Sequence, residues 1–412
     1  MEIILGLFQH KLFDCFLTGS SSVLNGAPIF SKFGDAMDPL APTQITHLFQ
    51  GDGSVSERLH TLHNRLLETS PQVCRIACAI YDHSSDLLKT FVNSTRVGNA
   101  IQAYQAKLTE VPSLLALAQQ GQCRVIDQIP LSIQAGAAHS NWLLEQPYLS
   151  SFTVPMYDNG QFLGFIFFDS DQPNYFSHAV QRDLLLYSNL INMALSSELS
   201  AVRAILASAQ VARDFAHLRD FETGAHLERM ARYAQLIAQG VASTYKLSDE
   251  TIEHIYLFAP LHDIGKIGIA DQILLKQGPL TDLERAEMQT HVQKGEDIML
   301  KVIGDFGLDH LPDSQVMRNI VACHHEMLDG SGYPRGLKGE QVPIEARIVT
   351  VADIFDALTS LRPYKQPWPV PKAFAELDQM VAAGKLDGFC VQALKDRIAT
   401  AQWIVASYPD QR

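Results

Sequence analysis

The sequence predicts a multidomain fold, in which an α+β domain with an antiparallel sheet is followed by a long connecting helix and an all-α domain. Three observations support this prediction. Between residues 54 and 175, apolar runs of strand length alternate with turn signals and helical segments. The stretch between Ser177 and Asp220 contains neither glycine nor proline, and helical patterns dominate from Phe221 onward. The length of 412 residues agrees with two or three domains, at roughly 100–200 residues each.

The composition indicates a globular protein that does not bind a nucleic acid polymer. Apolar residues make up 47% of the chain, charged residues make up 19%, and the formal net charge is −13. Neither half of the chain is basic, so counterion release cannot supply affinity for nucleic acid. No run of about 18 apolar residues predicts a membrane span, and the N-terminal stretch lacks the pattern of a signal peptide. We therefore expect a cytoplasmic protein whose six cysteines remain reduced.

The first 175 residues divide into an arm and an organised domain. Residues 1–50 show no sustained period and are expected to form an irregular N-terminal arm. After Ser54, apolar residues recur at helical spacing, which predicts a helix with a serine cap. Five short apolar runs then predict strands, and Asn159-Gly160 predicts a tight hairpin between the last two. The predicted strands are Cys74–Tyr81, Leu88–Asn93, Arg124–Ile126, Ser151–Met156 and Gln161–Asp169.

The order and size of these elements over residues 54–175 resemble those of a GAF domain, a module that senses a ligand or a signal. This resemblance implies an unknown ligand or signal at the N-terminal domain. A generic α+β dimerisation domain of the same architecture is the alternative, because no diagnostic motif accompanies the pattern.

The predicted connecting helix covers residues 176–218. Its apolar residues recur about every 3.5 positions, which is the period of a helix that pairs with another helix. One interpretation is a homodimer formed through this helix. The other is a single helix that packs on its own domain.

Histidines are concentrated in the C-terminal half. Eight of the 15 histidines lie between His217 and His325, many of them beside acidic residues. Glu222 and His226 are four residues apart, so on a helix they would project from one face and could bind one ion. In the adjacent pair His262-Asp263, the carboxylate could bridge two ions while the imidazole binds one.

Long motifs around these histidines resemble the HD-GYP family, which belongs to the HD metallohydrolases. The matching segments cover about half of the chain; they are Arg219–His226, Leu261–Gly268, His324–Gly339, Pro343–Ile348, Val351–Thr359 and Arg362–Lys365. The resemblance implies an all-α HD-type domain over residues 219–400. It also implies a bacterial enzyme that hydrolyses cyclic di-GMP or a related cyclic dinucleotide.

The resemblance further implies a set of metal ligands in this domain. These are Glu222, His226, His262, Asp263, His291, His324, His325 and Asp353. Imidazole and carboxylate ligands without thiolate favour iron, with manganese second, over structural zinc. We expect two divalent ions, or three if Glu222 takes part.

The expected reaction needs further residues. Paired cations neutralise a phosphodiester and activate water near neutral pH, and Asp263 is expected to bridge them. Lys266, one helical turn after His262, is expected to act beside the scissile phosphate. We expect the glycine-rich segment around Gly332 and Tyr333 to line the substrate, and Arg362 and Lys365 to contact its phosphates.

The expected function is therefore a metal-dependent phosphodiesterase that converts cyclic di-GMP to linear pGpG under control of the N-terminal sensor. Further hydrolysis to GMP is left open. One alternative is a phosphodiesterase that prefers 3′,3′-cyclic GMP-AMP. The other is a slow or non-catalytic receptor for a cyclic dinucleotide that acts through protein partners.

Overall fold

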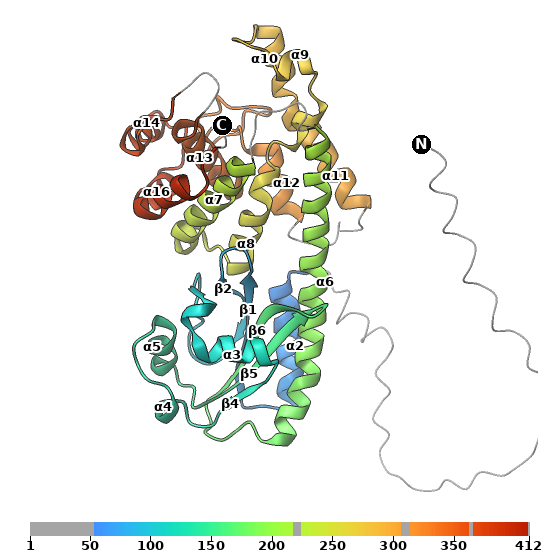
Figure 1. The fold of residues 1–412 in the computed structure, drawn as a ribbon, viewed down its shortest axis with the longest axis vertical. Helices are drawn as coiled ribbons and strands as arrows, with labels where there is room; N and C mark the ends of the chain where they lie inside the picture. Colours follow the sequence, from blue (N-terminus) through green and yellow to red (C-terminus); the bar gives the residue numbers. More distant parts are fainter. Residues whose placement is uncertain (1–52, 217–223, 306–313, 362–365, 411–412) are drawn as a thin grey trace, which may run out of the picture. The chain divides into compact units, whose positions relative to one another are not determined.

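The computed structural model describes residues 53–216, 224–305, 314–361 and 366–410 (Figure 1). The predicted N-terminal arm and the three predicted site residues Glu222, Arg362 and Lys365 lie outside these described residues. Residues Thr46–Arg412 belong to one compact unit.

The N-terminal region is built on one six-stranded antiparallel sheet with the strand order β3-β2-β1-β6-β5-β4. The strands are β1 (Val73–Asp82), β2 (Leu87–Thr95), β3 (Gln105–Lys107), β4 (Arg124–Ile126), β5 (Ser150–Asp158) and β6 (Gln161–Ser170). Asn159 and Gly160 join β5 to β6 with φ angles of 48° and 82°, which is the geometry that favours this dipeptide in a two-residue hairpin. The predicted α+β architecture of this region is confirmed.

Helices α2 (Val55–Thr69) and α6 (His178–Ala216) cover one face of the sheet. Ser54 caps α2 because its side chain accepts the amide hydrogen of Glu57, whose carboxylate in turn accepts the amide hydrogen of Ser54. The apolar stripe of α2 packs with strand residues such as Ile76 and Phe168 in one buried cluster. The other face carries the short helices α3 (Pro112–Gln120), α4 (Ile129–Ser132) and α5 (Ala138–Glu145).

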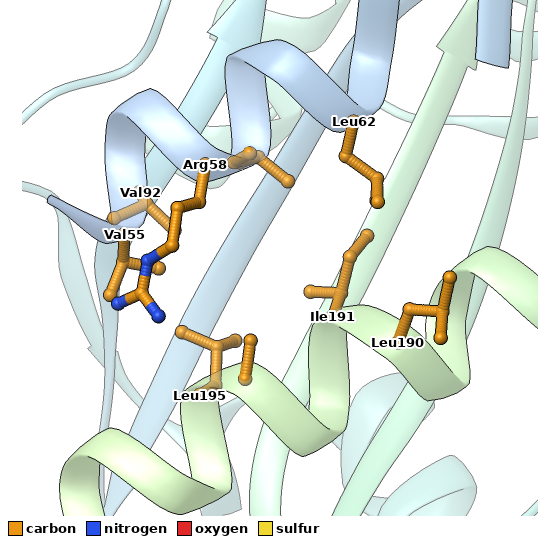
Figure 2. Close-up of a pocket in the computed structure, with 9 residues that line it drawn as sticks. Val55, Arg58, Leu62, Val92, Leu190, Ile191 and Leu195 are labelled. Carbon is orange, nitrogen blue, oxygen red and sulfur yellow. The ribbon is translucent and has the colours of Figure 1, made fainter. Parts of the chain in front are cut away.

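A small pocket remains between α2, α6 and strand β2 (Figure 2). Its walls are aliphatic except for Arg58, which forms an ion pair with the buried Glu198 of α6. The pocket is thus a gap in the apolar packing, and its charged group already has a partner.

Helix α6 contributes to two cores. Leu184 and Leu195 are buried in the core of the N-terminal sheet, whereas Val202 and Ile205 are buried in the core of the helical region. Residues 178–208 are also apolar and long enough to cross a membrane by composition alone. Its buried residues pack within its own chain, and 33% of its apolar window is buried.

The C-terminal region is helical, as predicted. Its α-helices are α7 (Gly224–Tyr245), α8 (Asp249–Phe258), α9 (Asp271–Leu274), α10 (Asp282–Gln289), α11 (His291–Asp305), α12 (Ser314–Cys323), α13 (Ile344–Thr359), α14 (Val370–Ala382), α15 (Gly388–Lys395) and α16 (Ile398–Ser407). Helices α7 and α13 contribute the fully buried Tyr233 and Phe355, whose rings meet edge to face at 5.1 Å. This core holds fixed the helix ends from which the histidines project.

Candidate metal centre

Five segments that are distant in sequence bring the histidines together. His226 lies on α7 and Asp353 on α13, whereas the other residues lie at helix ends. His262 and Asp263 occupy the joint between two short 3₁₀ segments, η2 (Ala259–Leu261) and η3 (Ile264–Gly268). His291 is the first residue of α11, and His324 and His325 directly follow α12.

These residues form two ligand groups. One group consists of Asp263, His291, His324 and His325, and the other consists of His226, His262 and Asp353. Within each group the candidate ligand atoms lie within 4.8 Å of one another. The structure therefore brings together the seven predicted ligands that it describes, and each group is suited to hold one cation.

Asp263 joins the two groups through its two carboxylate oxygens. Its Oδ1 lies 3.0 Å from Nε2 of His291 and 3.6 Å from Nε2 of His324. Its Oδ2 lies 3.1 Å from Nε2 of His262. One carboxylate thus has an oxygen directed toward each group, which is the arrangement of a ligand that bridges two cations.

Hydrogen bonds at Nδ1 orient the histidine rings. The Nδ1–H of His262 donates to the carbonyl of Ala259 at 2.9 Å, and that of His291 donates to the carbonyl of Met288 at 2.7 Å. His324 is oriented by the carbonyls of Ile320 and Val321 at 3.2 and 3.1 Å. A carbonyl only accepts, so Nδ1 carries the proton and Nε2 keeps its lone pair. This tautomer is the one that binds a metal ion through Nε2.

Protonation states in the site also suit metal binding. Burial lowers the pKa of His324, and burial together with the charge of His324 lowers the pKa of His325 to about 2. Burial would raise the pKa of Asp263, but Lys266 and His262 hold it well below its usual value. The imidazoles of His324 and His325 are therefore neutral and the carboxylate of Asp263 is ionised, which are the forms that coordinate a cation.

His226 is oriented by Asp356 and Arg229, two residues for which the sequence predicted no role. Nδ1 of His226 lies 2.8 Å from Oδ2 of the buried Asp356. Nε of Arg229 donates to Oδ1 of the same carboxylate at 2.6 Å. Asp356 lies three residues after Asp353 on α13, so the two carboxylates share a helix face. That spacing is the signal from which its position could have been predicted.

Lys266 reaches the site by a different local structure from the one expected. The prediction placed it one helical turn after His262 with its ammonium facing the ligand cluster; the segment is a 3₁₀ turn, and the ammonium contacts Asp263. Nζ of Lys266 lies 2.8 Å from Oδ2 of Asp263. The lysine is thus adjacent to the carboxylate oxygen that faces His262.

Tyr333 and Gly332 lie beside the first ligand group. The ring of Tyr333 stacks on His325, with centroids 4.7 Å apart and an interplanar angle of 30°. A Cβ on Gly332 would lie 2.3 Å from the amide nitrogen of Met327 and 2.5 Å from the carbonyl oxygen of His325. The glycine therefore permits the close backbone approach that holds Tyr333 over His325.

A second glycine positions the bridging carboxylate. A Cβ on Gly265 would lie 1.9 Å from the carbonyl oxygen of His291 and 2.4 Å from the amide nitrogen of Gly295. Only a residue without a side chain lets η3 lie this close to α11. Because of this contact, Asp263 and His291 can approach each other within 3.0 Å.

The helical region resembles a known protein family. Residues 210–389 match the HD domain family. The cyclic di-GMP phosphodiesterase response regulator RpfG of Xanthomonas campestris pv. campestris is 46% identical over 177 residues, which are 43% of each chain. A cyclic di-GMP phosphodiesterase of Thermotoga maritima is 44% identical over 168 residues, 41% of this chain and 42% of that one. The 3′3′-cGAMP-specific phosphodiesterase 2 of Vibrio cholerae is 43% identical over 150 residues, 36% of this chain and 27% of that one.

Solved structures resemble the N-terminal region. The GAF domain from Acinetobacter phosphoenolpyruvate-protein phosphotransferase has a TM-score of 0.29 and 14% identity, and the match covers 39% of this chain and 98% of that chain. The phycocyanobilin-bound GAF domain from a cyanobacterial phytochrome has a TM-score of 0.30 and 12% identity, with coverages of 38% and 91%. At such low scores, the GAF-like interpretation depends on the antiparallel α+β architecture described above.

The curated relatives extend well beyond the part that they share with this chain. The chain spans less than half the length of each of the three described above. Both ligand groups lie within the matched residues 210–389. The helical C-terminal region of this chain is therefore an HD domain.

Proposed function

We propose that this protein is a metal-dependent phosphodiesterase that hydrolyses cyclic di-GMP to linear pGpG, with a further step to GMP left open. The observation that carries the proposal is Asp263, which directs one oxygen toward His291 and the other toward His262. A bridging carboxylate between two groups of imidazoles is the equipment that two-metal phosphodiester hydrolysis needs. Relatives named as cyclic di-GMP phosphodiesterases support the choice of substrate.

The cofactors that we propose are two divalent ions, iron first and manganese second. Two ions, when bound, would supply charge neutralisation and an activated water. The first ligand group has three imidazoles and one carboxylate, a donor set without thiolate that suits these metals. A third ion would depend on Glu222, which remains a predicted ligand.

The residues of this chain have distinct proposed roles around the phosphate. Lys266 would place a positive charge beside the leaving oxygen, because its ammonium already lies against the bridging Asp263. Tyr333 would stack on or donate to the substrate from its place over His325. Arg362 and Lys365 remain predicted phosphate contacts, and Gly332 remains a predicted residue of the segment that lines the substrate.

The proposal is tested with the full chain loaded with Fe²⁺ under reductant or with Mn²⁺. Metal content is measured by plasma mass spectrometry, and the products of cyclic di-GMP are separated by chromatography. We expect about two ions per chain and linear pGpG as a product. Asp263→Ala should lose both ions, and its activity should fall by about 100-fold or more. The matched control Asp378→Asn, at an exposed aspartate paired with Lys395, should retain both.

If the chain binds metal but forms no linear product from cyclic di-GMP or cyclic GMP-AMP, the proposed hydrolase activity is contradicted. Saturable cyclic di-GMP binding without turnover would then favour the receptor alternative. The cyclic GMP-AMP alternative has support from the Vibrio cholerae relative named for that substrate. Comparing kcat/KM for the two dinucleotides on one preparation decides between them, since a one-base difference acts through contacts at the edge of the site.

We also propose the remaining organisation that the sequence predicts. Residues 54–175 would sense an unknown ligand or signal, and residues 219–400 would hydrolyse the cyclic dinucleotide. Residues 176–218 would connect these two domains. A homodimer through the connecting helix has support from exposed apolar residues of α6, because Leu186 and Met193 are 65% and 58% exposed. A cytoplasmic location agrees with the five described cysteines, which are free thiols.

A further inference from the structure

A C-terminal strap, residues 408–410, contacts helix α7 beside the metal ligand His226. The strap follows α16, which packs against α7. His226, Arg229 and Arg232 lie three residues apart on α7, so each is adjacent to the next on the helix surface. The guanidinium of Arg232 lies 4.8 Å from the centroid of the Tyr408 ring, and Arg229 donates to the carbonyl of Tyr408 at 2.7 Å. The strap is therefore held against α7 at two neighbouring arginines.

The strap completes the hydrogen bonds of the buried Arg229. Nε and Nη2 donate to Asp356 at 2.6 and 3.0 Å, and Nη2 also donates to the hydroxyl of Ser360 at 2.7 Å. Nη1 donates instead to the carbonyl of Tyr408 at 2.7 Å and to Oδ1 of Asp410 at 3.1 Å. The side chain of Arg229 is only 3% exposed, and a buried guanidinium needs acceptors for its donors. Among the described residues, the strap supplies both acceptors of Nη1.

Asp410 also joins the two helices that carry His226 and Asp353, two members of the second ligand group. Its Oδ1 accepts from Arg229 on α7, and its Oδ2 accepts the amide hydrogen of Leu361 at 3.1 Å. Leu361 lies two residues beyond the end of α13, the helix that carries Asp353. The side chain of Asp410 is 14% exposed, so these hydrogen bonds are largely shielded from water. One carboxylate therefore ties α7 to the end of α13.

A continuous series of polar contacts leads from the strap to the metal centre. Asp410 accepts from Arg229, Arg229 donates to Asp356, and Oδ2 of Asp356 lies 2.8 Å from Nδ1 of His226. The side chains of Arg229, Asp356 and His226 are each less than a tenth exposed. In such a buried network, each group fixes the next one. Without Asp410, Nη1 of Arg229 would lose an acceptor and the guanidinium would be less firmly held against Asp356.

We propose that Asp410 positions His226 through this series of contacts and thereby raises the affinity of the second ligand group for its cation. The strap lies beyond residues 210–389, the part of the chain that matches the HD domain family. This inference rests on the proposed function, because it takes the second ligand group to be a cation site. Its test measures metal binding and backbone protection without turnover. A chain that binds both ions but forms no pGpG would therefore contradict the hydrolase and leave the role of Asp410 intact.

The test compares three variants of the full chain with the native protein. Asp410→Ala removes the carboxylate, Asp410→Glu keeps it, and Asp378→Ala is the matched control at an exposed aspartate paired with Lys395. Each protein is titrated with Mn²⁺, and bound ions are counted by plasma mass spectrometry. Electron paramagnetic resonance distinguishes an isolated Mn²⁺ from two neighbouring ions. Hydrogen–deuterium exchange of the metal-free proteins measures the protection of the backbone around His226 and Leu361.

We expect Asp410→Ala to weaken the second ligand group by about 3–10-fold, less than the roughly 10–100-fold expected for a residue bonded directly to a ligand. The first ligand group should keep its affinity, so the signal of an isolated ion should appear at Mn²⁺ concentrations that fill both groups of the native chain. Exchange around His226 and Leu361 should become faster. Asp410→Glu should restore most of the affinity, and Asp378→Ala should match the native chain.

Equal loss of affinity at both ligand groups would show that the strap only stabilises the fold, and it would overturn the proposal. Unchanged affinity and exchange in Asp410→Ala, or a loss that Asp410→Glu shares in full, would overturn it as well. If the native chain binds two ions and forms pGpG in these cases, the proposed function stands while the role of Asp410 fails. Should Asp410→Ala not fold, Asp410→Asn takes its place, since it keeps the shape of the side chain and removes its charge.

Discussion

His226 and Asp356 are joined by a contact of 2.8 Å between Nδ1 and Oδ2, deep in the helical core. Arg229 donates to both oxygens of the same carboxylate, through Nε at 2.6 Å and a terminal nitrogen at 3.0 Å. Burial would raise the pKa of Asp356, but hydrogen bonds from His226 and Arg229 lower it to about 2. The ionised carboxylate thus holds the proton of His226 at Nδ1 and directs Nε2 toward His262 and Asp353.

Asp356→Asn should weaken metal binding at one group more than at the other. The amide keeps the shape of the side chain but no longer favours a proton on Nδ1, so the group with His226 should lose about 10–100-fold in affinity. The group with His291 and His324 should keep its ion. Metal titration followed by plasma mass spectrometry should give about one ion per chain in place of two.

Folding provides the control for this variant, because Arg229 would be left beside a neutral amide. Circular dichroism and thermal unfolding should confirm a folded chain before the metal count is interpreted. Loss of both ions in equal measure from a folded protein would contradict the separate orientation of His226 by Asp356. Asp378→Asn, at an exposed aspartate, again serves as the control and should change neither the metal content nor the thermal unfolding.

Local sequence chemistry accounts for much of the fold and for part of the ligand set, whereas the full set was implied by the resemblance to the HD-GYP family. Alternating apolar residues and the Asn159-Gly160 turn place β5 and β6 within two residues of the observed bounds. His324-His325 and His262-Asp263 could be identified because residues able to bind metal recur at short spacing in a helical region. These signals are contained in the chain itself and need no knowledge of tertiary contacts.

Features that arise only from packing were not predictable. The strand β3 is three residues long and contains Gln105 and Lys107, so it has no apolar alternation and exists because β2 offers an edge. The 3₁₀ segment η3 lies against α11 at Gly265, where any side chain would clash with the backbone. The partner of Asp356 is 130 residues away in sequence, a separation that no local pattern encodes.

Gly265→Ala should destabilise the helical region and lower metal affinity. Its Cβ would meet backbone atoms of His291 and Gly295, which cannot rotate away. We expect a loss of about 1–3 kcal/mol or more in the free energy of unfolding. Gly304→Ala is the matched control, because among the described residues a Cβ there would meet no atom within 4 Å beyond its own helix backbone, and alanine favours a helix by up to about 1 kcal/mol. Urea unfolding should show a lower free energy of unfolding for Gly265→Ala and a higher one for Gly304→Ala.

Asp82 should make stability depend on pH in a narrow acidic range. Burial would raise its pKa, but Lys89 and hydrogen bonds from Ser84 and Ser85 lower it to about 2. A carboxyl with a depressed pKa stabilises the fold above its unfolded value near 4, and that contribution is lost as the pH falls through 2. The stability difference between the native chain and Asp82→Asn should be about 2 kcal/mol at pH 6 and should shrink between about pH 4 and pH 2. A difference that stays constant over this range would contradict the assigned pKa.

The contributions of Lys89 of β2 and Glu253 of α8 to stability should be coupled. Nζ of Lys89 lies 3.2 Å from Oε1 of Glu253, and both side chains are less than a tenth exposed. Lys89→Met should cost about 3–5 kcal/mol because it leaves the carboxylates of Glu253 and Asp82 without their cation. Adding Glu253→Met should recover part of this loss, since only Asp82 then lacks its cation. A double-mutant cycle at the exposed Lys395 and Asp378 should give less than about 1 kcal/mol. Additive effects of the two buried substitutions in urea unfolding would contradict a coupled pair, and with it a direct link between the N-terminal sheet and the helix that leads to His262.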